Sequence, residues 1–499
     1  MNPSYPIRRV ICLFLLLALL VACRQPSTES LALPTSTPPA VLTLVVLPTR
    51  TLAPTSTLLA PTPTVTPTVL PTPVATRYEI QPGDNYLSIA LDHNITLEEL
   101  LAINQLTGDE TLRVGETLIV PLSIPVSLPP SYLVHDSEVV YGRAYVGWDT
   151  AAFVAAQGGF LADYREGDLS GAEIIDAVAA KYHVGPRVLL AAMETLSGWV
   201  SSKAPHSLSP FGLEGEGAPD LQWQSGWAAR QLMEGYYGQL EGRRDWVVLK
   251  GSTPARLSPG TNAGSAAVAN LLAAVEPAST FPDLLLSERF QQSYHRLFGE
   301  VEGGAVLPPE RRQPFFELPF PEEELWYFTG GPHGGWGDSI SGWAALDFAP
   351  PVARGCWPSA YPIRAVADGL VVSSDAGEVW VDLDGDGDLR TGWVLLYMHL
   401  YAEGRVGVGT SVRVGDLMGY PSCEGGVSNA SHLHLARLYD GQWMPAAGPV
   451  PFQLGDWSAE AVVGSSYDGF LKSRRGMTLK ACDCRSRRQN RFPEKQYVG

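Results

Sequence analysis

The sequence predicts a multidomain chain: a small α+β module, a mostly α-helical middle domain and a mainly antiparallel β domain. The chain has 499 residues, which is more than one hydrophobic core usually spans. Apolar residues make up 45% of it, enough for most of the chain to fold. The spacing of the apolar residues is helical in much of 130–305 and changes to short runs between turns after residue 310.

The charge balance bears on the class of partner. The formal net charge is −17, and charged residues are only 17% of the chain, a low share for a cytoplasmic enzyme. A chain this acidic is repelled by nucleic-acid phosphates. We therefore expect no nucleic-acid partner.

The N-terminus predicts export. Arg8 and Arg9 precede an apolar run over 10–21, which has the length of a signal-peptide core and is short for a membrane span. The run ends in Leu20-Val21-Ala22-Cys23, which resembles a bacterial lipobox. This resemblance implies that the signal peptide 1–22 is removed and that Cys23 carries a lipid anchor to a membrane. The alternative, an uncleaved membrane anchor, exports the rest of the chain as well.

A linker follows over residues 23–76. Residues 26–76 contain 11 Pro and 14 Thr, and their only charged residues are Glu29 and Arg50. Such a stretch favours extended, polyproline-like conformations. At roughly 3.1 Å per residue it could reach on the order of 150 Å, so we expect it to hold the later domains away from the membrane.

Residues 77–122 read as a strand, two helices and a strand. Asp84 can cap the first helix, Thr96 and Glu99 form a capping box for the second, and residues 117–120 form the last strand. The module resembles a LysM domain in the runs Ile80-Gln81-Pro82-Gly83-Asp84, Ile89-Ala90, Ile103-Asn104 and Gly115-Glu116-Thr117-Leu118-Ile119-Val120-Pro121. The resemblance implies binding of glycans that contain N-acetylglucosamine. Asn85-Tyr86 departs from the family pattern, and the alternative is an unrelated small α+β module.

The middle domain, over residues 130–305, has apolar stripes at helical spacing, for example in 174–179 and 188–193. Residues 189–199 faintly resemble the helix that carries the catalytic Glu of lysozyme-like lytic transglycosylases. Leu196 stands where that family has its Glu, and Glu194 lies on another face of the helix. Because general-acid catalysis needs a carboxyl group at one defined place, we expect a non-catalytic, degenerate relative or an unrelated helical bundle.

Residues 310–455 are predicted to form an antiparallel β domain, followed by a C-terminal extension over 456–499. Short apolar runs at 370–372, 379–381 and 394–397 alternate with turns rich in Gly, Asp and Pro. Residues 382–388 are acidic at every second position and resemble the start of a calcium loop. Trp393 occupies the position where such a loop has Glu, so we favour a hairpin turn and leave calcium open.

Four of the nine His residues of the chain fall in this β domain: His333, His399, His432 and His434. Residues two apart on a strand point to the same face, so His432 and His434 should reach one cleft. Two imidazoles and a carboxylate with an open fourth position make a hydrolytic zinc site.

This pattern resembles the lysostaphin-type, LytM-like zinc metallopeptidases over roughly residues 325–450. The matching segments are Leu346-Asp347-Phe348-Ala349-Pro350, Tyr397-Met398-His399-Leu400, Val408-Gly409 through Gly419, and His432-Leu433-His434. The resemblance implies that Asp347 and His434 bind Zn²⁺ and that His399 and His432 are catalytic. One of the two would accept a proton from water while the other stabilises the charged intermediate.

The third ligand departs from the common branch of that family, which has a His four residues before the Asp. Trp343 stands there and cannot bind zinc. Gly330-Gly331-Pro332-His333 instead resembles the staphylolysin and beta-lytic branch, as does Cys423-Glu424-Gly425-Gly426. The resemblance implies that His333 is the third ligand. The alternative is a surface His in a Gly-rich loop.

Four Cys lie beyond the signal region, at positions 356, 423, 482 and 484. An even number in an oxidising compartment allows two disulfides, with three connectivities. Cys423 should brace the loop before His432, and Cys356 is its expected partner because no other Cys lies in the β core. Cys482 and Cys484 would then pair or stay free.

These features predict an exported, lipid-anchored zinc metalloendopeptidase that LysM brings to the cell wall and that cuts peptidoglycan peptide cross-links. One alternative is a catalytically inactive LytM-type lipoprotein that activates a cell-wall amidase. Inactive relatives usually lose several site residues, whereas this chain keeps all four His and Asp347. A second alternative, a glycan-binding scaffold with a glycan-cutting middle domain, is disfavoured by Leu196.

Overall fold

The structure is a computed structural model, and it describes residues 75–493 apart from 82–83, 94, 96, 105, 108–109, 111, 122–125, 130, 214–219, 251–252, 278, 308–310, 322, 338–339 and 463. The chain divides into two units, 1–68 and 69–499. The predicted signal peptide, lipidated Cys23 and all of the linker but its last two residues lie outside the described residues, as does Thr96 of the predicted capping box. Within the described part, no helix has the length and apolar character that crossing a membrane requires.

The first module has the predicted order of strand, helix, helix and strand. Its elements are β1 (Ala75–Glu79), α1 (Tyr86–Asp92), α2 (Leu97–Asn104) and β2 (Thr117–Pro121), and β1 pairs antiparallel with β2. A core of Ile80, Ile89, Ala90, Leu100, Leu118 and Val120 joins helices to strands. The Asn104 side chain donates to the carbonyl of Ile119 and accepts from its N–H, which fixes α2 on β2.

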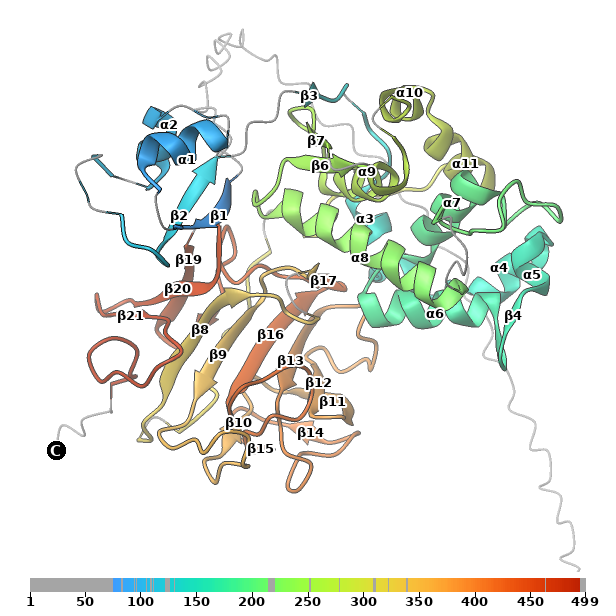
Figure 1. The fold of residues 1–499 in the computed structure, drawn as a ribbon. Coiled ribbons are helices and arrows are strands. Elements are labelled where there is room, and N and C mark those ends of the chain that lie inside the picture. Colours follow the sequence, from blue (N-terminus) through green and yellow to red (C-terminus); the bar gives the residue numbers. More distant parts are fainter. Residues whose placement is uncertain are drawn as a thin grey trace, which may run out of the picture. The chain divides into compact units, whose positions relative to one another are not determined.

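The middle domain is mostly helical, as predicted (Figure 1). Its helices are α3 (Asp136–Val139), the 3₁₀ turn η1 (Arg143–Tyr145), α4 (Thr150–Gln157), α5 (Phe160–Asp163), α6 (Gly171–Tyr182), α7 (Pro186–Ser197), α8 (Leu221–Leu240), α9 (Ala263–Val275), α10 (Phe281–Leu286) and α11 (Arg289–Phe298). Short strands accompany them: β3 (Val126–Ser127), β4 (Arg165–Glu166), β5 (Leu169–Ser170), β6 (Trp246–Leu249) and β7 (Thr253–Arg256).

Close packing of α8 on α9 organises this domain. A Cβ atom at Gly235 would lie 2.6 Å from the carbonyl oxygen of Ala266. The two helices therefore approach at a point that only glycine permits. The facing helix α9 is buried along nearly its whole length, so small residues set the spacing in the core.

Glu194 is the acidic residue nearest to Leu196, which stands where the lysozyme-like family has its catalytic Glu. It is buried at the end of α7. Its carboxylate accepts from the N–H groups of Val200 and Ser201 and from the guanidinium of Arg296. Burial would raise the pKa of Glu194, but these partners lower it below its usual range. An ionised carboxylate so fully engaged fits a structural role and has no proton to give as a general acid.

The β domain is built on one antiparallel sheet of order β14-β11-β12-β13-β16-β9-β8, with β17 paired to β16 (Figure 1). The strands are β8 (Tyr327–His333), β9 (Ala345–Ala349), β11 (Gly369–Asp375), β12 (Glu378–Asp382), β13 (Trp393–Met398), β14 (Ser411–Val412), β16 (Leu433–Tyr439) and β17 (Gln442–Trp443). A separate pair is formed by β10 (Ile363–Arg364) and β15 (Leu417–Gly419). The three apolar runs expected at 370–372, 379–381 and 394–397 fall in β11, β12 and β13.

Both faces of this sheet are covered. Along β13, Leu395 and Tyr397 belong to the core of the β domain, whereas Val394 and Leu396 belong to the core shared with the helices. The alternation follows from the two-residue period of a strand. Strands buried on both faces explain why the run 393–398 is apolar throughout.

Polar contacts join the helices to the sheet. The N–H of Trp443 donates to the Tyr237 hydroxyl oxygen over 2.9 Å, and the N–H of Trp343 donates to the Glu241 carboxylate over 2.7 Å. The Trp343 ring also lies under the Arg243 guanidinium. Trp343, which stands where the common branch has a zinc ligand, is thus held by the helical domain.

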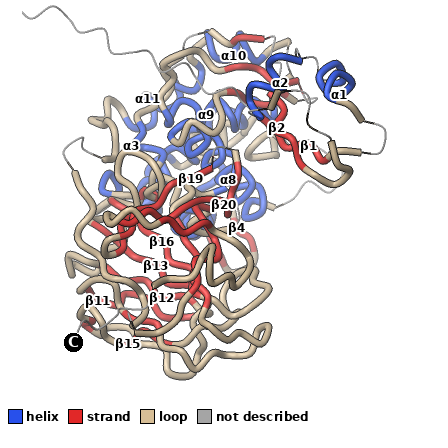
Figure 2. Tube along the Cα trace, turned by 90° about the vertical axis from the view of Figure 1, so that its left-hand side faces the viewer, coloured by secondary structure: helices blue, strands red, loops and turns tan. Residues whose placement is uncertain are grey.

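The C-terminal extension forms a further antiparallel sheet from β18 (Gln453–Leu454), β19 (Trp457–Val462), β20 (Ser465–Ser473) and β21 (Thr478–Lys480). No strand was predicted for these residues. Trp457, Ala459, Leu471 and Leu479 belong to the core of the β domain, so the extension is part of that fold. In Figure 2, β19 and β20 lie beside strands of the large sheet.

Candidate metal centre

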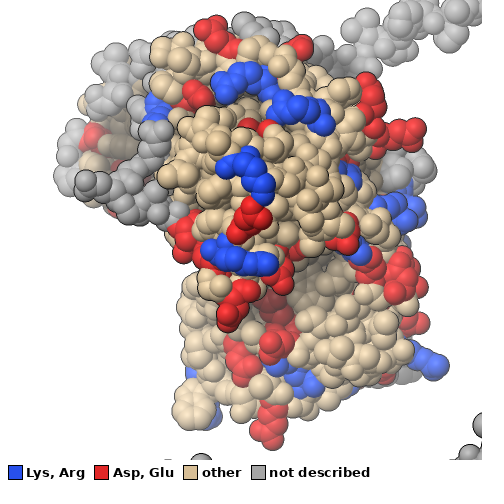
Figure 3. Space-filling model, turned by 90° about the vertical axis from the view of Figure 1, so that its right-hand side faces the viewer, with Lys and Arg blue, Asp and Glu red and all other residues tan. Residues whose placement is uncertain are grey.

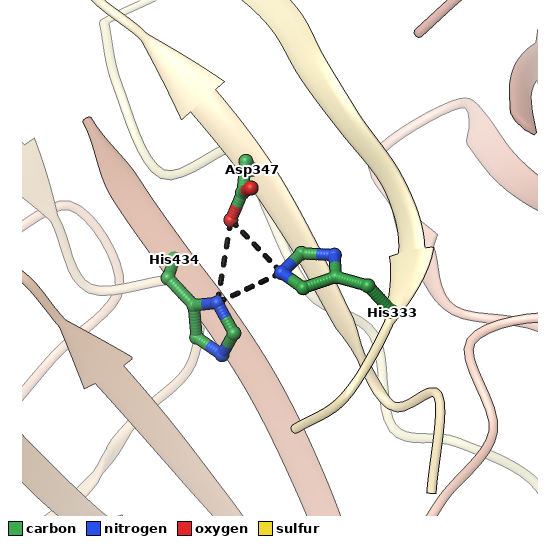
Figure 4. A group of neighbouring side chains, drawn as sticks. All are labelled: His333, Asp347 and His434. Atoms are coloured by element: carbon green, nitrogen blue, oxygen red, sulfur yellow. Dashed lines mark hydrogen bonds and ion pairs between the residues drawn. The ribbon is translucent and has the colours of Figure 1, made fainter. Parts of the chain in front are cut away.

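Three neighbouring strands carry the three candidate ligands. His333 is the last residue of β8, Asp347 lies in the middle of β9, and His434 is the second residue of β16. His434 and Asp347 are directly opposed in the antiparallel register. Figure 4 shows the three side chains pointing toward one another, and all three are buried.

The spacing of the candidate ligand atoms fits one small ion. Nε2 of His333 lies 3.0 Å from Nδ1 of His434, and each of these nitrogens lies 3.3 Å from Oδ1 of Asp347. Atoms bound tetrahedrally to zinc at about 2.0–2.1 Å are separated by roughly 3.3 Å. Two imidazoles and one carboxylate are also the donor set of hydrolytic zinc sites. The residues therefore fit a zinc ion.

Backbone carbonyls orient both imidazoles. Nδ1 of His333 lies 2.7 Å from the carbonyl of Gly331, and Nε2 of His434 lies 3.0 Å from the carbonyl of Gly335. A carbonyl only accepts, so in the neutral rings these nitrogens carry the protons. The other nitrogen of each ring then directs a lone pair at Asp347. Facing lone pairs and a carboxylate oxygen call for a cation among them, and such carbonyl partners are typical of metal-binding His.

Asp347 adds a second sign of a cation. Its Oδ1 is buried and has no hydrogen-bond partner among the described residues. Burial would raise the pKa of Asp347, but the neighbouring His333 and His432 lower it well below its usual range. A buried carboxylate held in its ionised form and left with an unsatisfied oxygen costs free energy unless a cation binds it.

His399 and His432 complete the site beside these ligands. Nδ1 of His399 lies 3.0 Å from the carbonyl of Glu424, and Nδ1 of His432 lies 2.8 Å from that of Ala430. The two ring centres are 4.5 Å apart, and Nε2 of His432 lies 3.5 Å from Oδ1 of Asp347. His399 follows β13 with a φ of 65°, a conformation that is uncommon outside glycine.

The two imidazoles differ in their surroundings. Burial and the neighbouring His432 and His434 lower the pKa of His399 to about 3. Burial also acts to lower the pKa of His432, but Asp347 raises it above its ordinary value. One ring is therefore a neutral acceptor and the other is more readily protonated, which is the pairing that acid–base catalysis requires.

The site opens into a cavity of about 350 Å³. Its walls include Thr329, Ala349, residues 427–431, Tyr467, Asp483, Cys484 and Arg485. The Tyr467 ring stacks on the His333 ring, with 4.1 Å between the ring centres. The backbone φ of Tyr467 is 66°. Sequence reasoning missed this wall, because nothing in residues 456–499 resembles a motif and only the fold brings them to the site.

Disulfides brace two of the loops around the cavity. Cys356 is joined to Cys423, and Cys482 to Cys484. The first link holds the segment before Glu424, whose carbonyl contacts His399. The second lies in the wall contributed by the C-terminal extension.

The acidic run 382–388 forms the turn between β12 and β13, as the favoured interpretation expected. Asp382 is buried and accepts from the N–H groups of Asp384 and Gly387. Carboxylate oxygens of Asp382, Asp384 and Asp386 lie within 4.8 Å of one another. Backbone contacts within the turn already account for this geometry, so it carries no separate argument for calcium.

Two segments of the chain match known protein families. Residues 78–121 match the LysM domain family, and residues 132–309 match the family described as LasA, N-terminal domain. The chain is 26% identical over 367 residues to protease LasA of Pseudomonas aeruginosa strain UCBPP-PA14. The aligned region covers 68% of this chain and 81% of that relative.

Solved structures also align with part of the chain. An M23 metalloprotease, pseudoalterin from the deep sea, is 22% identical, with 33% of this chain and 94% of that chain covered and a TM-score of 0.27. The catalytic domain of lysostaphin from Staphylococcus simulans is 20% identical, with 24% and 87% covered and a TM-score of 0.18.

Proposed function

We propose that this chain, a multidomain relative of protease LasA with a LysM domain, is a zinc metalloendopeptidase that hydrolyses peptide bonds of peptidoglycan. The observation that carries the proposal is the set of His333, Asp347 and His434. Their three facing donor atoms lie 3.0–3.3 Å apart, at the spacing that a tetrahedral zinc site needs.

The remaining residues of the site support a hydrolytic role. When bound, zinc supplies a Lewis acid that polarises a carbonyl group and lowers the pKa of a water molecule. His399, neutral because burial lowers its pKa, accepts a proton on its Nε2. His432, whose protonated form Asp347 favours, donates to the negative charge that develops on the scissile carbonyl oxygen.

The walls of the cavity come from several separate segments of the chain. Its walls come from the sheet, from the loop 427–431 and from the C-terminal extension. Asp483 and Arg485, which carry opposite charges, also line the cavity and can pair with charged groups of a peptide. An open site admits a peptide that continues beyond it on both sides, as a cross-link does.

The N-terminal modules supply the location. LysM domains bind glycans containing N-acetylglucosamine, so residues 77–122 would hold the enzyme on peptidoglycan and raise its local concentration there. The signal peptide 1–22, the lipid anchor at Cys23 and the linker 23–76 would export the chain, attach it to a membrane and let it reach into the wall.

The alternative of an inactive amidase activator is less well supported. All five proposed site residues are present, and they converge on one cavity. The pairing of His399 and His432, each oriented by a backbone carbonyl, has no use in a protein that only binds a partner.

The test uses residues 24–499, the exported chain without its proposed lipid-bearing Cys23, incubated with isolated peptidoglycan of several cross-link chemistries. We expect the zinc-loaded protein to release new amino and carboxyl termini from at least one of them. A chelator should stop the reaction and added zinc should restore it. Zinc-loaded protein that cuts none of these walls would refute the proposal, and stimulation of an added amidase by the inert protein would favour the activator.

A further inference from the structure

A groove of about 590 Å³ lies in the helical domain, between the end of α6 and the start of α8. Neither the metal centre nor the LysM domain contributes to its lining. Three aromatic residues line it, Tyr182, Trp223 and Trp227, together with the cations Lys181 and Arg230 and the acid Asp220.

The three aromatic side chains form a partly exposed apolar surface, on which Trp223 is exposed and Tyr182 and Trp227 are half-buried. Trp223 is 54% exposed, and Trp227 lies four residues further along α8, on the same side of the helix. Gly226 lies between them and adds no side chain to the groove. Indole and phenol rings with one face open to water are suited to flat ligands that are part apolar and part polar.

The charges in the groove favour an anionic ligand. Among the residues that the structure describes, no ion pair involves Lys181 or Arg230, although the Lys181 ammonium lies 5.6 Å from the centre of the Tyr182 ring. Asp220 is engaged at the start of α8, where its carboxylate accepts from the N–H of Trp223. Figure 3 shows that local groups of Lys and Arg occur on the surface of this acidic chain.

We propose that this groove is a second glycan-binding site, which takes an amino-sugar strand bearing carboxylates. Sugar rings present C–H faces to aromatic rings and hydroxyl or amide groups to polar side chains, and carboxylates would meet Lys181 and Arg230. The inference rests on the proposed cell-wall function for the source of the ligand. Peptidoglycan offers such carboxylates on muramic acid where the stem peptide has been removed, and within the stem peptide where it is still attached.

The groove is connected to the metal centre through one aromatic contact. Tyr182 packs edge-on against Trp336, with ring centres 6.0 Å apart. Trp336 follows the candidate ligand His333 by three residues, and its indole N–H donates to Glu378, the first residue of β12. This contact joins one wall of the groove to the loop that follows His333.

Hydroxyl-radical footprinting of the exported chain tests this directly, because it reports on Trp223 separately from the LysM domain. The probes are glycan strands freed of peptide, disaccharide–peptide fragments, neutral chitin oligosaccharides and free stem peptides. We expect the first two to reduce oxidation of Trp223 several-fold and chitin oligosaccharides to have a much smaller effect. The probe that acts more strongly identifies the source of the carboxylate.

Variants supply the affinity measurement. Trp223→Ala and Lys181→Ala should each weaken binding of peptide-free strands, with a loss for Trp223→Ala on the order of tenfold, typical of truncating an aromatic anchor. Leu208→Ala, at an exposed apolar residue outside the groove, should bind like the wild type. Cleavage of a small soluble peptide should be unchanged in all three.

Two results would overturn this inference. One is unchanged oxidation of Trp223 at glycan concentrations that protect residues 77–122. The other is protection by free stem peptides alone, which would make the groove a peptide site. Either result leaves peptidase activity untouched, and a protein that is inert on walls but protected at Trp223 would refute the proposed enzyme while the groove stands.

Discussion

Gly330→Ala is expected to damage the metal centre without changing any ligand. Gly330 lies in β8 opposite Asp347 in the antiparallel register. A Cβ atom there would lie 2.4 Å from Oδ2 of Asp347 and 2.9 Å from its Cβ. Since heavy atoms pack at about 3.5–4.0 Å, the carboxylate must move by roughly 1 Å.

That displacement is large for a metal site. Zinc–ligand distances hold to within about 0.2 Å, so Asp347 could no longer bind in its present position. We expect zinc affinity to fall about 10- to 100-fold, as when the supporting contacts of a ligand are altered. The fold should persist, with a loss of about 1–3 kcal/mol from overpacking.

Competition with a chromogenic zinc chelator measures this affinity, and circular dichroism checks the fold. Gly407→Ala is the matched control in the same domain, because no atom lies within 4 Å of its added Cβ. If Gly330→Ala bound zinc as tightly as Gly407→Ala and the wild type, then Asp347 would not be a ligand, and the geometric reasoning would fail.

Two further predictions concern stability. Replacing both Cys356 and Cys423 by Ser opens a link between residues 67 apart and should cost about 2–4 kcal/mol in urea unfolding; an unchanged midpoint would contradict this. Burial between helix and sheet lowers the pKa of His183 to about 4, below its unfolded value of about 6.5. The unfolded chain thus binds the extra proton, and stability should fall by up to about 3 kcal/mol between pH 6.5 and 4. His183→Asn tolerates the φ of 54° and should show a smaller decline; equal declines would refute this origin.

Local signals predicted the LysM module and the strands that carry the site. The period of two over His432 and His434 predicted that both imidazoles reach one cleft, and both line the cavity; His434 lies in β16, and His432 immediately precedes that strand in a bridge with Ser422. The apolar runs of β12 and β13 are continuous because both faces of these strands are buried, whereas the run in β11 is only partly buried. The first strand nevertheless begins at Ala75, earlier than expected, because backbone pairing with β2 extends it into the linker.

Other features depend on contacts between distant segments and had no local signal. Tyr467 reaches His333 only because β20 packs beside β8. The orienting carbonyls of Gly331, Gly335 and Glu424 are backbone groups, which every residue has. The position of Trp343 against Arg243 likewise follows from packing between domains. Sequence could identify side chains with suitable chemistry, whereas their orientation came from the fold.

The most direct test of the account compares zinc content with peptidoglycan hydrolysis in four single variants of the exported chain. His434→Ala and Asp347→Ala should lose both zinc and activity, because each removes a ligand. His399→Ala and His432→Ala should retain about one zinc per chain and lose at least 100-fold in rate, the contribution typical of a general acid or base. Full activity in His399→Ala, or full zinc content in His434→Ala, would contradict the assigned roles.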